Sequence, residues 1–89
     1  MTKKRLFCEK TICGEDGVCL CVGYYLLLKQ GSAWGVAVET ERRGQKEWAA
    51  VEGLLLKQEH MEGLLSLLSR NNVTTCTLKE IVAELRNKF

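Results

Sequence analysis

The sequence contains no apolar run long enough to cross a membrane as a helix. The longest candidate, residues 18–28, is shorter than the roughly 18 consecutive apolar residues that a span needs, and Gly23 interrupts it. The basic N-terminus is not followed by the apolar stretch of a signal peptide, because Glu9, Lys10 and Glu15 break it. We therefore expect a cytoplasmic protein.

Motifs for metal and phosphate binding are also lacking. The five cysteines include no Cys-x-x-Cys pair, so the spacing of Cys8, Cys13, Cys19 and Cys21 does not indicate a zinc site. Neither Gly14 nor Gly17 is followed by the Lys-Ser or Lys-Thr and helix of a phosphate-binding loop. The sequence predicts no metal, no cofactor and no catalytic residue, and hence no enzyme.

The cysteine count is odd, and no signal peptide accompanies it, which argues against a disulfide framework. We expect reduced thiols that pack as small buried hydrophobic side chains. Cys76 directly precedes the last predicted helix, a position that favours thiol reactivity. The sequence supplies no neighbouring base that would make it catalytic.

A strong charge of one sign is absent too. The formal net charge is +2, which is too small to imply a polyanionic partner. Local basic clusters occur at the N-terminus and near the middle of the chain. If the protein binds nucleic acid, these clusters supply the contacts: Lys3, Lys4, Arg5, Arg42 and Arg43.

What is present fits one small globular domain. The chain has 89 residues, of which 46% are hydrophobic and 27% charged, and these values are ordinary for folded proteins. We divide the single domain, residues 1–89, into three parts. They are an N-terminal strand and turn (1–17), a sheet (18–56) and a helical pair (57–89).

Three stretches of the first half have strand character. Residues 1–13 alternate loosely, with Leu6, Cys8 and Lys10 expected on one face, and residues 14–17 form a turn. Residues 18–29 are rich in β-branched and aromatic side chains, and Gly23 suggests a bulge or a close backbone approach there. Residues 34–41 alternate clearly, and their expected inward side chains are Trp34, Val36, Val38 and Thr40.

Residues 46–56 are ambiguous. Trp48 and Ala50 alternate with Ala49 and Val51, as in a fourth strand, yet a stretch without proline could also begin a long helix over residues 47–70. We favour the strand, because the tight turn at Gly44 calls for a hairpin partner.

From Gln58 onward the period changes to that of helices. The apolar side chains recur at helical spacing in Met61, Leu64, Leu65 and Leu68. Asn71 and Asn72 are typical helix-ending residues. Thr77 and Glu80 have the spacing of a capping box in front of a second helix. The buried face of that helix is expected to contain Leu78, Ile81, Val82, Leu85 and Phe89.

Together these stretches predict an α+β fold. A small antiparallel sheet of three to four strands, arranged as a meander, precedes two C-terminal helices packed on one face of it.

Several segments of the chain resemble a family of small uncharacterised proteins from clostridial and related Gram-positive bacteria. The resemblance covers residues 24–86 and rests on four segments, residues 24–27, 34–39, 67–74 and 78–82. In that family an aromatic-Gly-aliphatic strand precedes a helix that ends in a Leu-Leu-x-x-Asn hinge. This chain has Thr75 where the family pattern has a proline. The resemblance implies a cytoplasmic domain of unknown function without an assigned catalytic residue.

One histidine–carboxylate cluster exists, and we expect it to lie on a solvated helix face. His60 stands beside Glu59 and near Glu62, but neighbouring helical positions diverge and cannot share a proton.

The expected function is therefore protein–protein interaction or self-association, with a homodimer as one form of the latter. The basis is apolar surface in excess of what two helices can cover, including Tyr25 and Leu27 on the second face of a strand. Weak nucleic-acid binding through the two basic clusters is the alternative.

Overall fold

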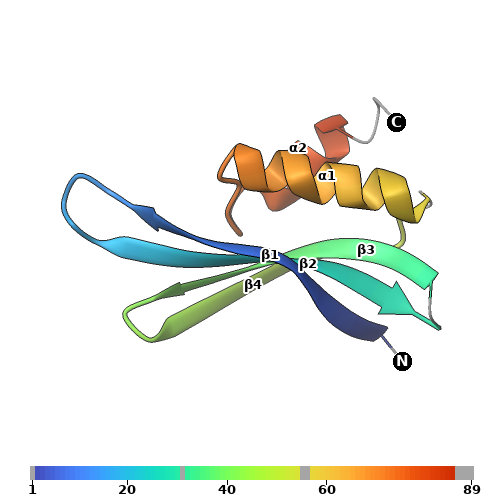
Figure 1. Cartoon of the computed structure of the whole chain (residues 1–89), viewed down its shortest axis with the longest axis horizontal. Helices are drawn as coiled ribbons and strands as arrows, with labels where there is room; N and C mark the ends of the chain where they lie inside the picture. Colours follow the sequence, from blue (N-terminus) through green and yellow to red (C-terminus); the bar gives the residue numbers. More distant parts are fainter. Residues whose placement is uncertain (1, 31, 55–56, 86–89) are drawn as a thin grey trace.

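The structure is a computed structural model, and it describes residues 2–30, 32–54 and 57–85. Within these residues the chain forms a four-stranded antiparallel sheet of order β1-β2-β3-β4 and then two helices. Figure 1 shows the helices together on one face of the sheet. The strands are β1 (Thr2–Cys13), β2 (Cys19–Lys29), β3 (Ser32–Arg42) and β4 (Gln45–Val51), and the helices are α1 (Gln58–Arg70) and α2 (Leu78–Leu85). The predicted α+β meander with two C-terminal helices on one face is confirmed.

Within the ambiguous stretch, residues 46–56, the strand expected from the tight turn forms, but it ends at Val51. Arg43 and Gly44 both have positive φ, of 52° and 81°, and such a turn matches the twist of paired strands. β4 then runs antiparallel to β3, with Ala50 opposite Ala37. The long helix over residues 47–70 does not form, since α1 begins at Gln58.

Two irregularities in the pairing shift side chains to faces that the sequence did not predict. In β1, Leu6 lies opposite Tyr25 whereas Cys8 lies opposite Tyr24. The extra residue, Phe7, therefore places Leu6 and Cys8 on different faces, and the expectation that they share one is wrong.

The second irregularity separates Trp34 from the inward face of β3. Leu28 pairs with Ala33 and Leu27 with Gly35, so Ala33 packs against the core in place of Trp34. The predicted bulge at Gly23 is also wrong, since Gly23 pairs regularly with its neighbours on both sides. The close approach there is to the Tyr25 side chain, whose Cε2 lies 3.0 Å from where a Cβ of residue 23 would stand.

The core lies between the sheet and the helices. Alternate side chains of β2 and β3 meet the apolar stripe of α1, and α2 packs beside α1 and over β4, as the two periodicities predict. Ile81 and Leu85 are only partly buried, and Phe89 lies outside the described residues. The buried core side chains from the regular elements include Val22, Tyr24, Leu26, Val36, Val38, Met61, Leu64, Leu65, Leu68, Leu78 and Val82.

Polar contacts fix the end of α1 on the sheet. The Lys10 ammonium of β1 donates to the carbonyl oxygen of Ser69 at 2.9 Å and to the side-chain oxygen of Asn72. Asn72 has φ of 52°, which is the left-handed conformation expected of a helix-ending asparagine. A cation at this point also complements the negative end of the helix dipole.

Tyr24 joins the sheet to the loop between the helices. Its side chain is fully buried, and its hydroxyl donates to the carbonyl oxygen of Val73 at 2.8 Å. Burial, and to a lesser degree the charge of an ionised Cys8, raises the pKa of Tyr24 to about 12. The folded protein therefore favours the neutral phenol.

Tyr24→Phe is expected to reduce stability by about 1–2 kcal/mol at neutral pH, because the Val73 carbonyl loses its donor. The pKa is about 10 in the unfolded chain and about 12 in the folded one. Stability that is intact below pH 10 is therefore lost as the pH rises toward 12. Urea unfolding at pH 8 and pH 11.5 measures both effects. The variant should lose clearly less stability than the wild type between these two pH values, and equal losses would contradict the assignment.

Candidate functional site

The most distinctive surface is the sheet face opposite the helices, which we call the open face. Side chains from all four strands alternate onto it, including Leu6, Tyr25, Ala37 and Trp48. Leu6 is 49% exposed and Trp48 is 45% exposed, and Phe7 at the bulge is 39% exposed. Among the described residues, these are the large hydrophobic side chains most accessible to solvent.

Aromatic rings and lysines pack against one another across the open face. The Lys4 ammonium lies 4.9 Å from the centre of the Tyr25 ring and 5.0 Å from that of Trp48. The two ring centres are 5.6 Å apart, and Glu39 Oε2 lies 3.9 Å from the same ammonium. Such a cation is attracted by the negative ring faces and by the carboxylate together. Lys4 thus lies across the sheet and links β1 to the farther strands.

The two ends of the open face carry opposite charge. One end has a hollow of about 170 Å³ lined by Glu9, Glu39 and Glu41 around Gly23 and Tyr25. Burial, followed by the charges of Glu39 and Glu9, raises the pKa of Tyr25. Lys29 lies toward the other end, where its ammonium sits 4.6 Å from the centre of the Trp34 ring, whereas the Lys4 ammonium lies beside Glu39 of the hollow. Lys46 offsets part of the acidic end, through an ion pair of 3.9 Å with Glu41.

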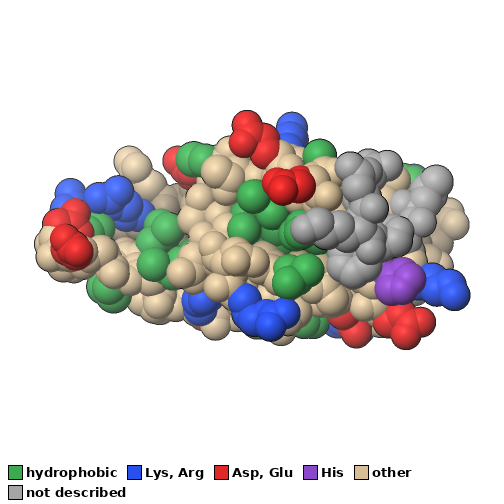
Figure 2. All heavy atoms as spheres, turned by 90° about the horizontal axis from the view of Figure 1, so that it is seen from above, with side chains coloured by type: hydrophobic (Ala, Val, Ile, Leu, Met, Phe, Trp, Pro, Cys, Tyr) green, Lys and Arg blue, Asp and Glu red, His purple; other side chains and the backbone are tan. Residues whose placement is uncertain are grey.

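The two basic clusters proposed for nucleic acid lie apart. Arg5 lies opposite Leu26 of β2, which in turn lies opposite Val36 of β3. Arg42 lies six residues beyond Val36, or about 20 Å farther along β3. Arg5 is also engaged across the layers, with Nη2 donating to Glu62 Oε1 at 3.4 Å. Lys3, Lys4 and Arg5 therefore do not join Arg42 and Arg43 in one patch. Viewed from the helix side, basic and acidic side chains are interspersed (Figure 2).

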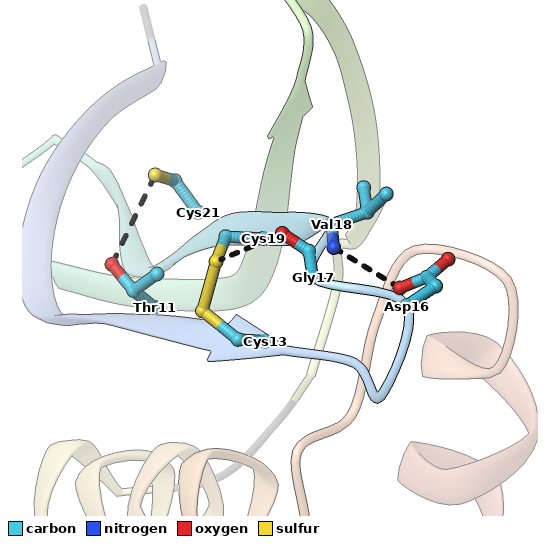
Figure 3. Close-up of a disulfide and its surroundings, with 7 residues drawn as sticks. All are labelled: Thr11, Cys13, Asp16, Gly17, Val18, Cys19 and Cys21. Atoms are coloured by element: carbon cyan, nitrogen blue, oxygen red, sulfur yellow. Dashed lines mark hydrogen bonds between the residues drawn. A yellow bond between two sulfur atoms is a disulfide. The ribbon is translucent and has the colours of Figure 1, made fainter.

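The cysteines differ most from expectation. Cys13 and Cys19 lie directly opposite each other at the end of the β1–β2 hairpin, where their sulfurs form a disulfide (Figure 3). Cys8, Cys21 and Cys76 are thiols. The prediction of reduced thiols is wrong for Cys13 and Cys19, which form the disulfide. The expectation that Cys8, Cys13, Cys19 and Cys21 are buried is also wrong, because Cys8 is half-buried and the other three are exposed.

The histidine–carboxylate cluster on α1 is only partly exposed. His60 and Glu59 are exposed, as expected, whereas Glu62 is half-buried and accepts hydrogen bonds from Arg5 and Gln58.

A pocket of about 370 Å³ that the sequence did not reveal lies between the sheet and the loop before α2. In it Thr75 Oγ1 donates to Glu47 Oε2 at 3.0 Å. It is lined by Leu20, Thr40, Arg42, Gln45, Glu47, Thr74, Thr75 and Cys76.

Metal ligation and membrane spanning find no support in the part of the chain that the structure describes. There, no group of three or more histidine, cysteine, aspartate or glutamate side chains could hold a metal ion. None of the helices in the same residues is long and apolar enough to cross a bilayer.

Part of the open face was accessible to sequence reasoning. The alternation of β2 placed Cys21, Tyr25 and Leu27 on its second face, and the structure confirms this placement. Trp48 was not assigned to the open face from the sequence, although its alternation with Ala49 indicates that the two side chains lie on opposite faces of the sheet. The contact of Lys4 with Trp48 had no signal in the sequence, because it joins β1 to β4, which are not neighbours in the sheet.

Comparison with known proteins places the chain in a family without assigning an activity. No curated protein and no solved structure shows significant similarity to it. Residues 3–88 match the family of unknown function designated DUF6514, which covers nearly the whole chain and both layers of the fold. The chain is therefore a member of the DUF6514 family.

Proposed function

We propose that the protein is a non-enzymatic interaction module that self-associates through the open face of its sheet. We place it in the cytoplasm of a clostridial or related Gram-positive bacterium, as the family resemblance implies. The observation that carries the proposal is the exposure of Leu6, Phe7 and Trp48 from the two edge strands, β1 and β4. Clusters of exposed apolar side chains with a polar rim mark interaction surfaces.

A second copy of the same chain is the occupant that the charges favour. On the open face, Lys29 lies toward one end, and the hollow of Glu9, Glu39 and Glu41, whose charge Lys4 and Lys46 offset in part, lies toward the other. A two-fold axis that lies in the interface, perpendicular to the strands and beside the central aromatic residues, would set the cationic end of each copy against the acidic end of the other. Self-complementarity of this kind is what a symmetric dimer requires.

Edge-to-edge pairing is less favoured than face-to-face packing. The outer edge of β1 carries Lys3, Lys4 and Arg5 followed by the bulge at Phe7. Basic side chains and bulges are devices that keep an edge strand from pairing with another sheet. The small net charge of +2 adds little general repulsion between two copies.

Exchanging the charges tests this arrangement. Lys29→Glu should weaken self-association about tenfold, since the second copy then meets carboxylates at both ends of the face. Adding Glu41→Lys to it should recover most of the loss. Both effects should diminish in high salt. Sedimentation velocity at several protein concentrations gives the dissociation constants. Equal constants for the wild type and Lys29→Glu would contradict the two-fold arrangement.

Nucleic-acid binding through Lys3, Lys4, Arg5, Arg42 and Arg43 remains the alternative. It would require two separate contact points, because the clusters lie about 20 Å apart along the strands. Titration with single-stranded and double-stranded oligonucleotides at low salt distinguishes the alternatives, since self-association predicts no saturable binding.

A further inference from the structure

The disulfide occupies a part of the fold on which the core does not depend. The end of the β1–β2 hairpin extends beyond the helices (Figure 1). Cys13 and Cys19 are both exposed, and neither belongs to the hydrophobic core cluster. A disulfide stabilises a fold more when the loop that it closes is longer. This one joins residues only six apart in sequence.

Hydrogen bonds already close the loop that the disulfide spans. The Gly14 amide donates to the Val18 carbonyl at 2.9 Å, and the Gly17 amide donates to the Gly14 carbonyl at 3.1 Å. The Val18 amide donates to Asp16 Oδ1 at 3.0 Å. β1 and β2 then pair continuously from Cys13 and Cys19 as far as the bulge. The hairpin therefore has the contacts to persist when the sulfur–sulfur bond is open.

The surroundings also suit the reduced form. Cys19 Sγ lies 3.9 Å from the carbonyl oxygen of Gly17, so a Cys19 thiol would have an acceptor in place (Figure 3). Cys21 lies two residues along β2 on the same face, with its Sγ 4.0 Å from Thr11 Oγ1. Cys21 lies opposite Thr11, whereas Cys19 lies opposite Cys13. Cys21 is therefore a separate, exposed thiol that does not take part in the disulfide.

We propose that Cys13 and Cys19 form a reversible thiol–disulfide exchange site that reacts with dithiols while the fold persists. A thiolate of the dithiol attacks one of the two exposed sulfurs, forming a mixed disulfide and releasing the other cysteine as a thiolate, which takes a proton from water. The second thiol of the reagent then resolves the mixed disulfide. Two electrons and two protons pass to the protein, and the dithiol becomes a disulfide. Such transient bonds are the kind that reducing compartments permit.

Thiol counting under native conditions tests the site. The full chain is equilibrated without denaturant in buffers of varied reduced-to-oxidised dithiothreitol ratio, quenched with acid, and alkylated after unfolding. Mass spectrometry should show three tags at the oxidising end, one each for Cys8, Cys21 and Cys76, and five at the reducing end. Returning the sample to oxidised dithiothreitol should restore three. Far-ultraviolet circular dichroism should be the same for both forms.

Two matched variants locate the reaction. Cys21→Ser should keep the two-tag change at an unaltered redox midpoint, whereas Cys13→Ser should show a constant count at every ratio. Replacing dithiothreitol with glutathione or with a dithiol protein such as a thioredoxin shows which source of thiol the site accepts. A count that rises only after urea is added, a count that stays at five in oxidising buffer, or loss of the fold on reduction would overturn the proposal. None of these readouts depends on self-association, which is measured separately.

Discussion

Replacement of Gly35 by alanine is expected to lower the free energy of unfolding by about 3 kcal/mol, because the new methyl group has no space. A Cβ at position 35 would lie 2.2 Å from the carbonyl oxygen of Val51 and 2.9 Å from the Cα of Glu52. Both atoms are backbone, so no side-chain rotation can relieve the overlap. The chain leaving β4 would have to move away from β3, where the Leu54 amide donates to the Trp34 carbonyl at 2.9 Å.

Gly63 supplies the control for this substitution. It lies within α1, and a Cβ there would meet nothing within 4 Å. Gly63→Ala should therefore raise stability by about 0.5–1 kcal/mol, through the helix preference for alanine. Urea unfolding followed by circular dichroism measures both variants. If Gly35→Ala unfolded at the same urea concentration as the wild type, the segment after β4 would not lie against Gly35 as described.

Trp48→Glu is expected to weaken the proposed dimer strongly. The indole is 45% exposed and contacts Tyr25 near the middle of the open face, a position typical of residues that dominate an interface. The substitution removes the apolar indole from the interface, and the new carboxylate, even with Lys4 close by, would have to be desolvated against the second copy. We expect the dissociation constant to rise at least about 30-fold, which corresponds to the 2 kcal/mol of an interface hot spot.

The matching control adds the same charge to the helix layer. Ala83 is exposed on α2, so Ala83→Glu should leave the dissociation constant of the dimer unchanged. Circular dichroism of both variants checks that the fold is kept. A dimer weakened equally by both substitutions would place the interface elsewhere or attribute the effect to charge alone.

The order and type of the elements were predictable because they depend on local patterns. Alternation in residues 34–41, helical spacing from Met61 to Leu68 and the turn residues Arg43 and Gly44 each act over a few neighbours, and the structure agrees with them. Binary patterning of this kind determines which face of an element is buried. It also determines that two short helices must cover one sheet face.

Features that depend on the register between strands were not predictable in the same way. The irregularities near Phe7 and Trp34 change which side chains share a face, and they arise from pairing with β2 rather than from either segment alone. The opposition of Cys13 and Cys19 likewise requires the hairpin register. Spacing along the chain does not show that those two sulfurs meet, so the prediction of reduced thiols was wrong for this pair.

Sedimentation equilibrium of the unmodified chain tests the central claim most directly. The chain has a mass of 10.0 kDa, and two-fold packing through the open face predicts a reversible rise to twice that mass across the micromolar range. Weakening of the association by salt is part of the prediction, because the two charged ends contribute to it. A mass that stays at that of one chain at every concentration would contradict self-association through this face.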